Sequence, residues 1–263
     1  MHIALTGATG GLGMAIACAY AGPGVRLSLS GRDENALVRV AGACREKGAL
    51  VHTARFDIRD GDALREWLAR ADATDPLTLV FANAGVSATA REERLEHPED
   101  ADRLFDINAK SAMRTASVAA ECMARRGSGA IVVMSSMAGL QKLPYSPAYS
   151  ASKAAARYYG LALRGWLAPK GVRVTVVCPG YVDTPMSDRL ESPKPFLWSP
   201  EKAALHIKRK LLRNPRQIVF PWPLALGIWL ESLLPGRFQE FFQRRFSFHV
   251  KPDKDSPERS AQS

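Results

Sequence analysis

Cysteine is scarce in this chain of 263 residues. Cys18, Cys44, Cys122 and Cys178 are scattered, and none belongs to a CxxC pair. This spacing argues against a disulfide framework and against a cysteine-based metal site. The N-terminus also lacks a basic region followed by a long apolar run, so a secretory signal is not expected. We therefore expect a cytoplasmic protein with reduced thiols and no metal.

Long apolar runs are missing as well. The uncharged stretch Ile218–Leu230 covers thirteen residues, which is too short to span a bilayer. Its two tryptophans precede a basic and aromatic segment, and this pattern is compatible with an element lying at the inner face of a membrane. Packing on the protein body or on another subunit is the alternative. The residues concerned are Trp222, Trp229, Phe238, Phe241, Phe242, Arg244 and Arg245.

Acidic residues are in deficit, and the deficit is local. The chain carries 36 Lys and Arg against 26 Asp and Glu, a net charge of +10. Lys194–Ser263 holds 13 basic and 6 acidic residues, or +7, and the preceding 193 residues hold 23 and 20, or +3. The basic segment would suit an acidic partner or an anionic surface, or it is a solvated face. We expect no nucleic-acid partner.

Short β-branched runs alternate with longer helical patterns along the chain. Since strand–helix alternation is typical of βαβ units, we predict a doubly wound parallel sheet, the Rossmann fold, with helices on both faces. Helical patterns cover Glu34–Lys47, Gly61–Ala71 and Asp100–Ala124, and others start at Pro147 and at Ser199–Pro200. The predicted strands are HIAL, VRLSLS, LVHTAR, LTLVFAN, AIVVMSS and VRVTVVCP.

The chain shows no repeat and no linker that would divide it. We assign residues 1–217 to one domain, 218–250 to an apolar and basic-aromatic extension packed on it, and 251–263 to a disordered tail. The proline-interrupted stretch before Ser199 contains Pro195, Phe196, Leu197 and Trp198. It predicts an apolar lid that would exclude water from a site.

A glycine-rich turn, TGATGGLG, follows the first predicted strand and opens the first helix. Gly7, Gly11 and Gly13 form the spacing GxxxGxG. Small residues let the backbone approach a pyrophosphate, whose charge lies at the helix N-terminus. Such turns also occur for other reasons, but the position after strand one favours a dinucleotide site.

The end of the second strand bears on the choice of dinucleotide. An acidic residue here binds the ribose hydroxyls, whereas an arginine accommodates a 2′-phosphate. Ser30 and Gly31 are followed by Arg32, which favours NADP(H) over NAD(H). Asp33 follows at once and could reach the ribose instead, and a surface arginine without this role is a further alternative.

Polar residues also follow the next strands, at the edge where open α/β sheets bind ligands. Asp57 after strand three predicts an adenine contact, with Ile58 beside it. Asn83, Ala84 and Gly85 after strand four predict a tight turn facing the cofactor.

Four tyrosines and one lysine lie within Leu143–Tyr159. Residues four apart share a helix face, and Tyr149 and Lys153 have this relation. A lysine cation, with a positive nicotinamide ring, would lower the pKa of Tyr149 from about 10. Tyr149 could then exchange a proton with a carbonyl oxygen. Tyr145 precedes the helix and is a candidate substrate contact, while Tyr158 and Tyr159 are expected to pack.

These motifs resemble, in order and spacing, the short-chain dehydrogenase/reductase family, from the N-terminus to about Met186. The resemblance rests on Thr6-Gly-x-x-x-Gly-x-Gly13, Asn83-Ala-Gly85, Asn108, Ser136, Tyr149-x-x-x-Lys153 and Pro179-Gly180.

The resemblance implies a role for each matching residue. Tyr149 would be the acid/base, Lys153 would bind the nicotinamide ribose, and Ser136 would hydrogen-bond the substrate oxygen. Asn108 would order a water in a proton relay. A satisfied structural asparagine is its alternative. The expected cofactor contacts are Thr6, Gly7, Gly11, Leu12, Gly13, Arg32, Asp57, Ile58, Asn83, Ala84, Gly85, Tyr149, Lys153, Pro179, Gly180, Val182 and Thr184. Val182 and Thr184 would hold the carboxamide.

The expected activity is oxidoreduction of a small carbonyl or alcohol substrate by a homo-dimer or homo-tetramer. Gly10 stands where some NADP-using members carry a basic residue, so the preference depends mainly on Arg32. A nucleotide-sugar epimerase or dehydratase and a non-catalytic nucleotide-binding regulator are the alternatives. The compact length argues against the first, and the presence of both Tyr149 and Lys153 argues against the second.

Overall fold

The computed structural model describes residues 1–87, 96–190 and 193–239. Seven parallel strands form one sheet in the order β3-β2-β1-β4-β5-β6-β7. The strands are β1 (His2–Thr6), β2 (Arg26–Gly31), β3 (Leu50–Arg55), β4 (Leu79–Ala82), β5 (Gly129–Met134), β6 (Val172–Pro179) and β7 (Gln217–Phe220). The order reverses between β1 and β4, which opens a crevice at the carboxyl edge. The predicted Rossmann fold is confirmed.

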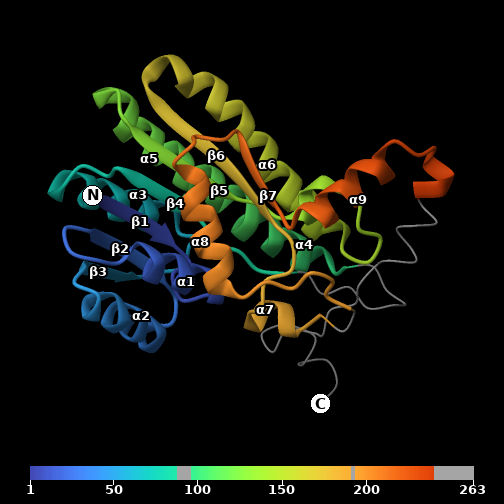
Figure 1. Cartoon of the computed structure of the whole chain (residues 1–263). Coiled ribbons are helices and arrows are strands. Elements are labelled where there is room, and N and C mark those ends of the chain that lie inside the picture. The colour runs from blue at the N-terminus through green and yellow to red at the C-terminus, as the bar shows by residue number, and fades with distance from the viewer. Residues whose placement is uncertain (88–95, 191–192, 240–263) are drawn as a thin grey trace.

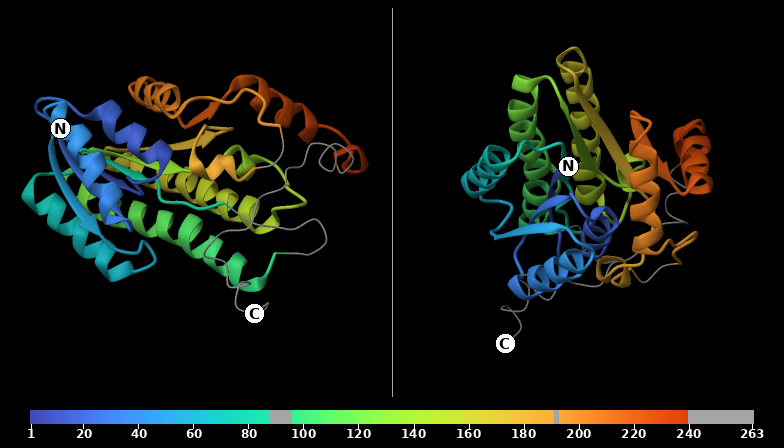
Figure 2. Two further views of the ribbon diagram at one scale, coloured as in Figure 1. Left: turned by 90° about the horizontal axis from the view of Figure 1, so that it is seen from below. Right: turned by 60° about the vertical axis from the view of Figure 1, so that its left-hand side comes forward.

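Helices cover both faces of the sheet (Figures 1 and 2). One face packs on α1 (Gly11–Tyr20), α2 (Glu34–Glu46) and α8 (Pro200–Leu211). The other packs on α3 (Gly61–Thr74), α5 (Ser111–Arg126) and α6 (Pro147–Leu167). Two apolar cores result, one on each side of the sheet. The remaining helices are α4 (Pro98–Leu104), a π-helix at Phe105–Lys110, 3-10 turns at Met137–Leu140 and Ala168–Lys170, α7 (Pro185–Asp188) and α9 (Trp222–Ser232).

The six predicted strands are all present, and α6 and α8 begin at Pro147 and Pro200 as predicted. The seventh strand was not predicted. From the sequence, Gln217 is assigned to the end of the domain and Ile218–Phe220 to the start of the apolar extension, whereas Val177 pairs with Ile218 and Cys178 with Val219. Ile218 and Phe220 are buried. The extension beyond residue 239 and the tail 251–263 lie outside the described residues.

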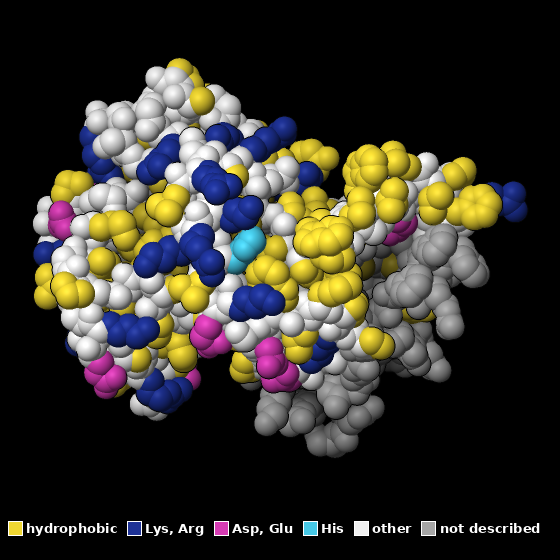
Figure 3. Space-filling model, viewed as in Figure 1, with side chains coloured by type: hydrophobic (Ala, Val, Ile, Leu, Met, Phe, Trp, Pro, Cys, Tyr) yellow, Lys and Arg dark blue, Asp and Glu magenta, His cyan; other side chains and the backbone are white. Residues whose placement is uncertain are grey.

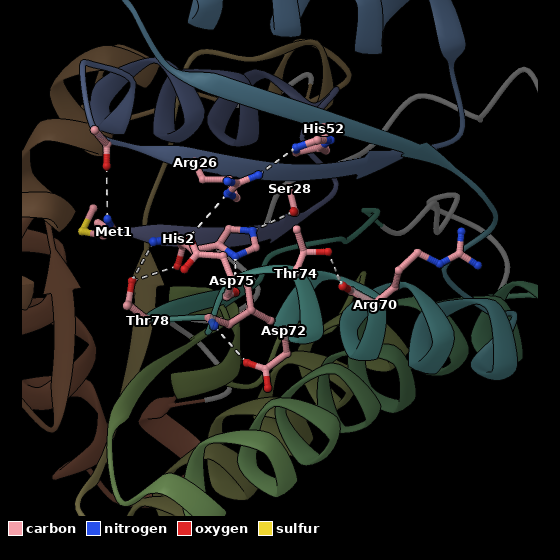
Figure 4. A network of polar contacts seen from close by, with 12 residues as sticks. Met1, His2, Arg26, Ser28, His52, Arg70, Asp72, Thr74, Asp75 and Thr78 are labelled. Atoms are coloured by element: carbon pink, nitrogen blue, oxygen red, sulfur yellow. Dashed lines mark hydrogen bonds and ion pairs between the residues drawn. The ribbon is translucent and has the colours of Figure 1, made fainter.

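A polar network closes the amino end of β1, away from the crevice (Figure 4). His2 is buried, and its Nδ1 donates to the carbonyl oxygen of Asp75 at 2.6 Å. Its Nε2 then accepts from the Ser28 hydroxyl at 2.9 Å. Burial lowers the pKa of His2, although the hydrogen bond with Asp75 opposes this shift. His2 is thus a neutral structural residue at neutral pH.

Candidate active site

A cavity of about 1540 Å³ opens at the carboxyl ends of the strands. Every predicted catalytic or cofactor residue lines it except Thr6 and Asn108, which lie behind its wall: the lining includes Gly7, Gly11, Leu12, Gly13, Arg32, Asp57, Ile58, Asn83, Ala84, Gly85, Ser136, Tyr149, Lys153, Pro179, Gly180, Val182 and Thr184. Residues from the ends of six strands, β1 to β6, therefore meet in one space. Among the described residues, no group of His, Cys, Asp and Glu could hold a metal ion.

The glycine turn is packed too tightly for side chains. Gly7 has a φ of +67°, and a Cβ there would lie 2.8 Å from Ala84 Cα. On Gly13 a Cβ would lie 2.2 Å from the carbonyl oxygen of Gly7, and on Gly11 it would lie 2.6 Å from Thr184 Cγ2. These contacts bring the turn against β4 and against the segment after β6. Glycine is therefore required here by packing.

The same turn leaves the N-terminus of α1 available to a ligand. Gly10 is the N-cap, and no side chain caps the helix. Helix N-termini have N–H groups without intrahelical partners, together with a positive dipole end, and both favour a phosphate group. Because the cavity runs past this terminus, the residues present fit the pyrophosphate of a dinucleotide.

Thr6 and Asn83 join the ends of β1 and β4. The Thr6 hydroxyl oxygen accepts from the N–H groups of Asn83 and Ala84, at 2.9 and 3.1 Å. The Asn83 amide donates to the carbonyl oxygens of Thr6 and Gly7, at 3.0 and 3.2 Å. Both side chains thus hold the glycine turn in place, and their effect on a cofactor is exerted through this backbone.

At the end of β2, Asp33 and Arg32 are used differently. The Asp33 carboxylate is the N-cap of α2 and accepts from Ala36 N–H at 2.9 Å. Arg32 is exposed and lines the cavity. Across from it, Asp57 is ion-paired with Arg59 at 2.7 Å, and this hydrogen-bonded pairing lowers the pKa of Asp57. Arg32 is therefore the basic side chain at this end that faces the space.

The catalytic candidates come from β5 and α6. Ser135 donates to the carbonyl oxygen of Lys153 at 2.8 Å and so fixes α6 to the end of β5. Tyr149 and Lys153 lie one turn apart, with Lys153 Nζ 6.0 Å from the centre of the Tyr149 ring. Ser136 hydrogen-bonds Tyr149. This brings together a phenol, an ammonium and a hydroxyl, the groups needed to bind and protonate a carbonyl oxygen.

Burial dominates the titration of this pair. It raises the pKa of Tyr149, and the hydrogen bond with Ser136 opposes the increase. Burial also lowers the pKa of Lys153 to about 8, so the ammonium is still mostly charged at neutral pH. The predicted lowering of the Tyr149 pKa, by Lys153 together with a nicotinamide ring, is therefore not found for the protein side chains by themselves, because desolvation raises this pKa more than the Ser136 hydrogen bond lowers it.

Asn108 belongs to the π-helix and is fully buried. Its Oδ1 accepts from Val86 N–H at 2.8 Å, and its Nδ2 donates to the Val86 carbonyl oxygen at 3.0 Å and to Ser152 Oγ at 3.2 Å. A Cβ on Gly85 would meet Lys153 Nζ at 3.0 Å and Asn108 Oδ1 at 3.1 Å. Asn108 thus anchors the loop after β4 next to Lys153, and its role in a proton relay stays a prediction.

Glu96 is a residue near the site that was not predicted from the sequence. Its Oε2 accepts from Ala148 N–H at 2.7 Å, and Tyr149 N–H also hydrogen-bonds to this carboxylate. Ser146, the N-cap of α6, makes no side-chain cap bond, so Glu96 supplies an acceptor for the helix that carries Tyr149. Burial raises its pKa. No motif marks Glu96, and 52 residues separate it from Ala148.

The segment after β6 forms another wall of the cavity. Thr184 and Ser187 make a capping box at α7, with Thr184 Oγ1 accepting from Ser187 N–H at 3.3 Å. Of the predicted lid, Pro195 alone lines the cavity. Trp198 packs on His206 and Phe220, while Phe196 and Leu197 are exposed. Tyr145 does not line the cavity, Tyr158 is exposed, and Tyr159 packs on a core.

The last wall is α9, which the motifs did not identify. Leu224, Ile228 and Leu234 line the cavity from this helix and from its C-terminal end. Leu143, in the loop before α6, and Met186, in α7, line it as well. The end of the cavity beyond Tyr149 is therefore largely apolar.

Comparison with known proteins gives a consistent assignment. The model of the short chain dehydrogenase family matches residues 1–195. An uncharacterized oxidoreductase of Myxococcus xanthus is 34% identical over 242 residues, which cover 92% of this chain and 95% of the relative.

Two solved structures share the fold and carry different nucleotides. Actinorhodin polyketide ketoreductase, a variant with NADPH, is 26% identical, covers 83% of this chain and 94% of its own, and has a TM-score of 0.73. NAD⁺-bound xylitol dehydrogenase is 27% identical, covers 69% and 70%, and has a TM-score of 0.66. With the glycine turn, Ser136, Tyr149 and Lys153 in one cavity, this chain belongs to the short-chain dehydrogenase/reductase family of NAD(P)-dependent oxidoreductases that act on carbonyl or alcohol substrates.

Proposed function

We propose that this protein transfers hydride between NADP(H) and an apolar carbonyl or alcohol, with Tyr149 as the general acid/base. The observation that carries the proposal is the meeting of Ser136, Tyr149 and Lys153 at the junction of the nucleotide end and the apolar end of the cavity. A bound nicotinamide would supply or accept the hydride. The protein's own residues bind the oxygen and move the proton.

In the direction of reduction, the Ser136 hydroxyl and the Tyr149 phenol bind the carbonyl oxygen. The phenol gives its proton to this oxygen as the carbonyl carbon receives hydride, leaving an alcohol and a tyrosinate. The Lys153 ammonium, one turn away, stabilises the tyrosinate. Because the pKa of Tyr149 is raised, the phenol is protonated at neutral pH and ready to donate.

The Tyr149→Phe variant tests this assignment by removing the proton donor while keeping the ring. We expect kcat to fall at least about 100-fold, within the range for general acid catalysis, with NADPH affinity unchanged. The measurement is turnover of a panel of ketones followed by NADPH absorbance, together with NADPH binding by fluorescence. Persisting activity in Tyr149→Phe with intact cofactor binding would contradict the mechanism.

Preference for NADP(H) is supported by the different use of Arg32 and Asp33. Asp33 is engaged as the N-cap of α2, whereas Arg32 faces the cavity. We expect Arg32→Ala to weaken NADPH binding roughly tenfold, the loss of a charge-assisted contact, and to leave NADH binding nearly unchanged. Lys47→Ala, on the loop after α2, is the control. An unchanged ratio of the two affinities would contradict the preference.

We also infer a homo-dimer or homo-tetramer, since Tyr158 and Trp166 of α6 are 67% and 58% exposed. Light scattering on the purified chain measures this directly. No described helix has the length and apolar character required to cross a bilayer.

A further inference from the structure

Helix α9 is apolar on two opposite sides. One side, with Leu224 and Ile228, lines the cavity. On the other side Trp222, Leu226 and Trp229 are 72%, 44% and 57% exposed. At 100° per residue these three side chains fall on one stripe. None of the residues of α9 is buried, and Figure 1 shows the helix projecting from the body.

An exposed apolar stripe of this kind needs an explanation. Large exposed apolar patches on soluble proteins mark binding surfaces for a protein, a membrane or a ligand. Two indole rings favour a membrane–water interface, where one part of the ring is apolar and the other wet. Since α9 carries no charge from Trp222 to Leu230, nothing on this stripe opposes entry into the interface.

The charges beside α9 indicate what it contacts. From Pro200 to Gln217 the chain has six basic residues and one acidic residue, Glu201. Figure 3 shows Lys and Arg side chains over α8 on the same face as the hydrophobic side chains of α9. Arg209, Lys210, Arg213 and Arg216 are exposed. None of these four forms an ion pair with any residue that the structure describes.

A second copy of the chain fits this face less well. A two-fold interface brings the same patch of both subunits together, so the basic residues of one α8 would face those of the other and repel them. An anionic lipid surface meets both features at once. It attracts the basic residues, by about 1 kcal/mol for each one near the surface, and accepts the apolar stripe.

We propose that the face formed by α8 and α9, with Trp222 and Trp229 at its apolar end, binds an anionic lipid membrane. The inner side of α9 is a wall of the cavity, so an apolar carbonyl or alcohol can pass from the bilayer into the site beside this helix. The proposal that this face binds a membrane depends only on its exposed residues. The proposal that substrate enters from the bilayer depends in addition on the proposed function.

The test is co-sedimentation of the full chain with vesicles of phosphatidylcholine, alone or with about 30% phosphatidylglycerol. We expect binding to the anionic vesicles only, weakened by high salt. Trp222→Ser with Trp229→Ser, and separately Arg209→Glu with Lys210→Glu, should each lower the partition coefficient roughly tenfold or more. A size-exclusion profile of each variant reports on its oligomeric state.

Matched controls lie at the C-terminal end of α6 and in the 3-10 turn and strand β6 that follow it. Trp166→Ser removes an indole that is 58% exposed, and Lys170→Glu with Arg173→Glu reverses two charges. Both should sediment like the parent chain. Equal binding to the two kinds of vesicle, or equal loss in control and test variants, overturns the docking. A dimer that dissociates in Trp222→Ser with Trp229→Ser assigns the face to a second copy and also overturns it.

The delivery step is tested with ketones of increasing chain length. The Trp222→Ser, Trp229→Ser variant should lose turnover of a long-chain ketone held in anionic vesicles and keep turnover of a short, water-soluble ketone. Equal turnover of both by variant and parent overturns the delivery. If the parent chain itself does not bind NADPH, or does not turn over short ketones, the proposed function is contradicted instead, because neither measurement involves vesicles.

Discussion

The two ends of the cavity are built in opposite ways. The nucleotide end consists of strand ends and a glycine turn, where one added methyl group would collide with backbone. The other end is closed by α9, which has no buried residue and in which a methyl group added to Gly227 would meet no described atom within 4 Å. The family match also ends at residue 195, before α8 and α9. The nucleotide end is tightly constrained by packing, whereas the end closed by α9 is not.

Substituting glycine at each end should give the largest difference. In Gly13→Ala the methyl group would lie 2.2 Å from the carbonyl oxygen of Gly7. We expect the free energy of unfolding to fall by about 3 kcal/mol, as for overpacked sites, and NADPH affinity to fall at least tenfold. Urea denaturation and NADPH titration measure the two effects.

The matched change at the other end is Gly227→Ala. It removes a poor helix former from α9 and should raise the free energy of unfolding by up to about 1 kcal/mol, with NADPH affinity unchanged. Equal responses of Gly13→Ala and Gly227→Ala would show that the two ends do not differ in constraint.

The same division explains how much could be predicted from the sequence. The strands β1 to β6 are apolar runs bounded by polar turns, and Pro147 and Pro200 mark helix starts, so local pattern was sufficient. The strand β7 has four residues and runs into the apolar segment that forms α9. Its pairing with β6 is set by tertiary contact, which leaves no periodic signal in so short a run.

In the site, the motifs correctly predicted which residues line the cavity, but they did not predict the environment of those residues. Tyr149 and Lys153 could be paired from their spacing, whereas the desolvation that raises the pKa of Tyr149 depends on what covers α6. The wall formed by α9 follows no family motif. Glu96 acts through a carboxylate that reaches a helix 52 residues away, a contact that one sequence does not reveal.

Burial of Lys153 should appear in the pH dependence of stability. Its pKa is about 8 in the folded protein and 10.5 in the unfolded chain. Between these values the unfolded chain binds more protons, so the free energy of unfolding rises with pH, by up to about 1.4 kcal/mol per pH unit. As pH falls through 8 this contribution is lost. Urea denaturation across this interval, for the parent chain and for Lys153→Met, gives the slope due to Lys153.

Lys210→Met, at an exposed position of α8, is the control and should run parallel to the parent chain. Parallel curves for Lys153→Met and the parent chain would mean that the ammonium is hydrated in the folded protein. That outcome would contradict the burial of Lys153 at the junction of the two ends.

A smaller effect than that of Gly13→Ala is expected at Glu96, which has no motif yet supports the constrained end. Glu96→Ala removes the acceptor for Ala148 N–H and Tyr149 N–H. We expect a loss of about 1 kcal/mol in the free energy of unfolding, as for a helix cap, and a roughly tenfold lower kcat as Tyr149 loses its fixed position. Glu96→Gln keeps a carbonyl oxygen in place and should restore kcat to within about twofold.

Steady-state kinetics as a function of pH separates positioning from simple stability. The raised pKa of Glu96 means that the protonated form is favoured in the fold, so its contribution to stability is present below the unfolded value and is lost as pH rises through the folded one. Glu96→Gln should remove this pH dependence of stability and retain kcat. Glu99→Ala, at an exposed position of α4, should change neither the pH dependence nor kcat. If Glu96→Gln is as impaired as Glu96→Ala while both remain folded, acceptance of the two N–H groups is not what places Tyr149. The constrained end of the cavity would then be held by its motif residues and their strand ends alone.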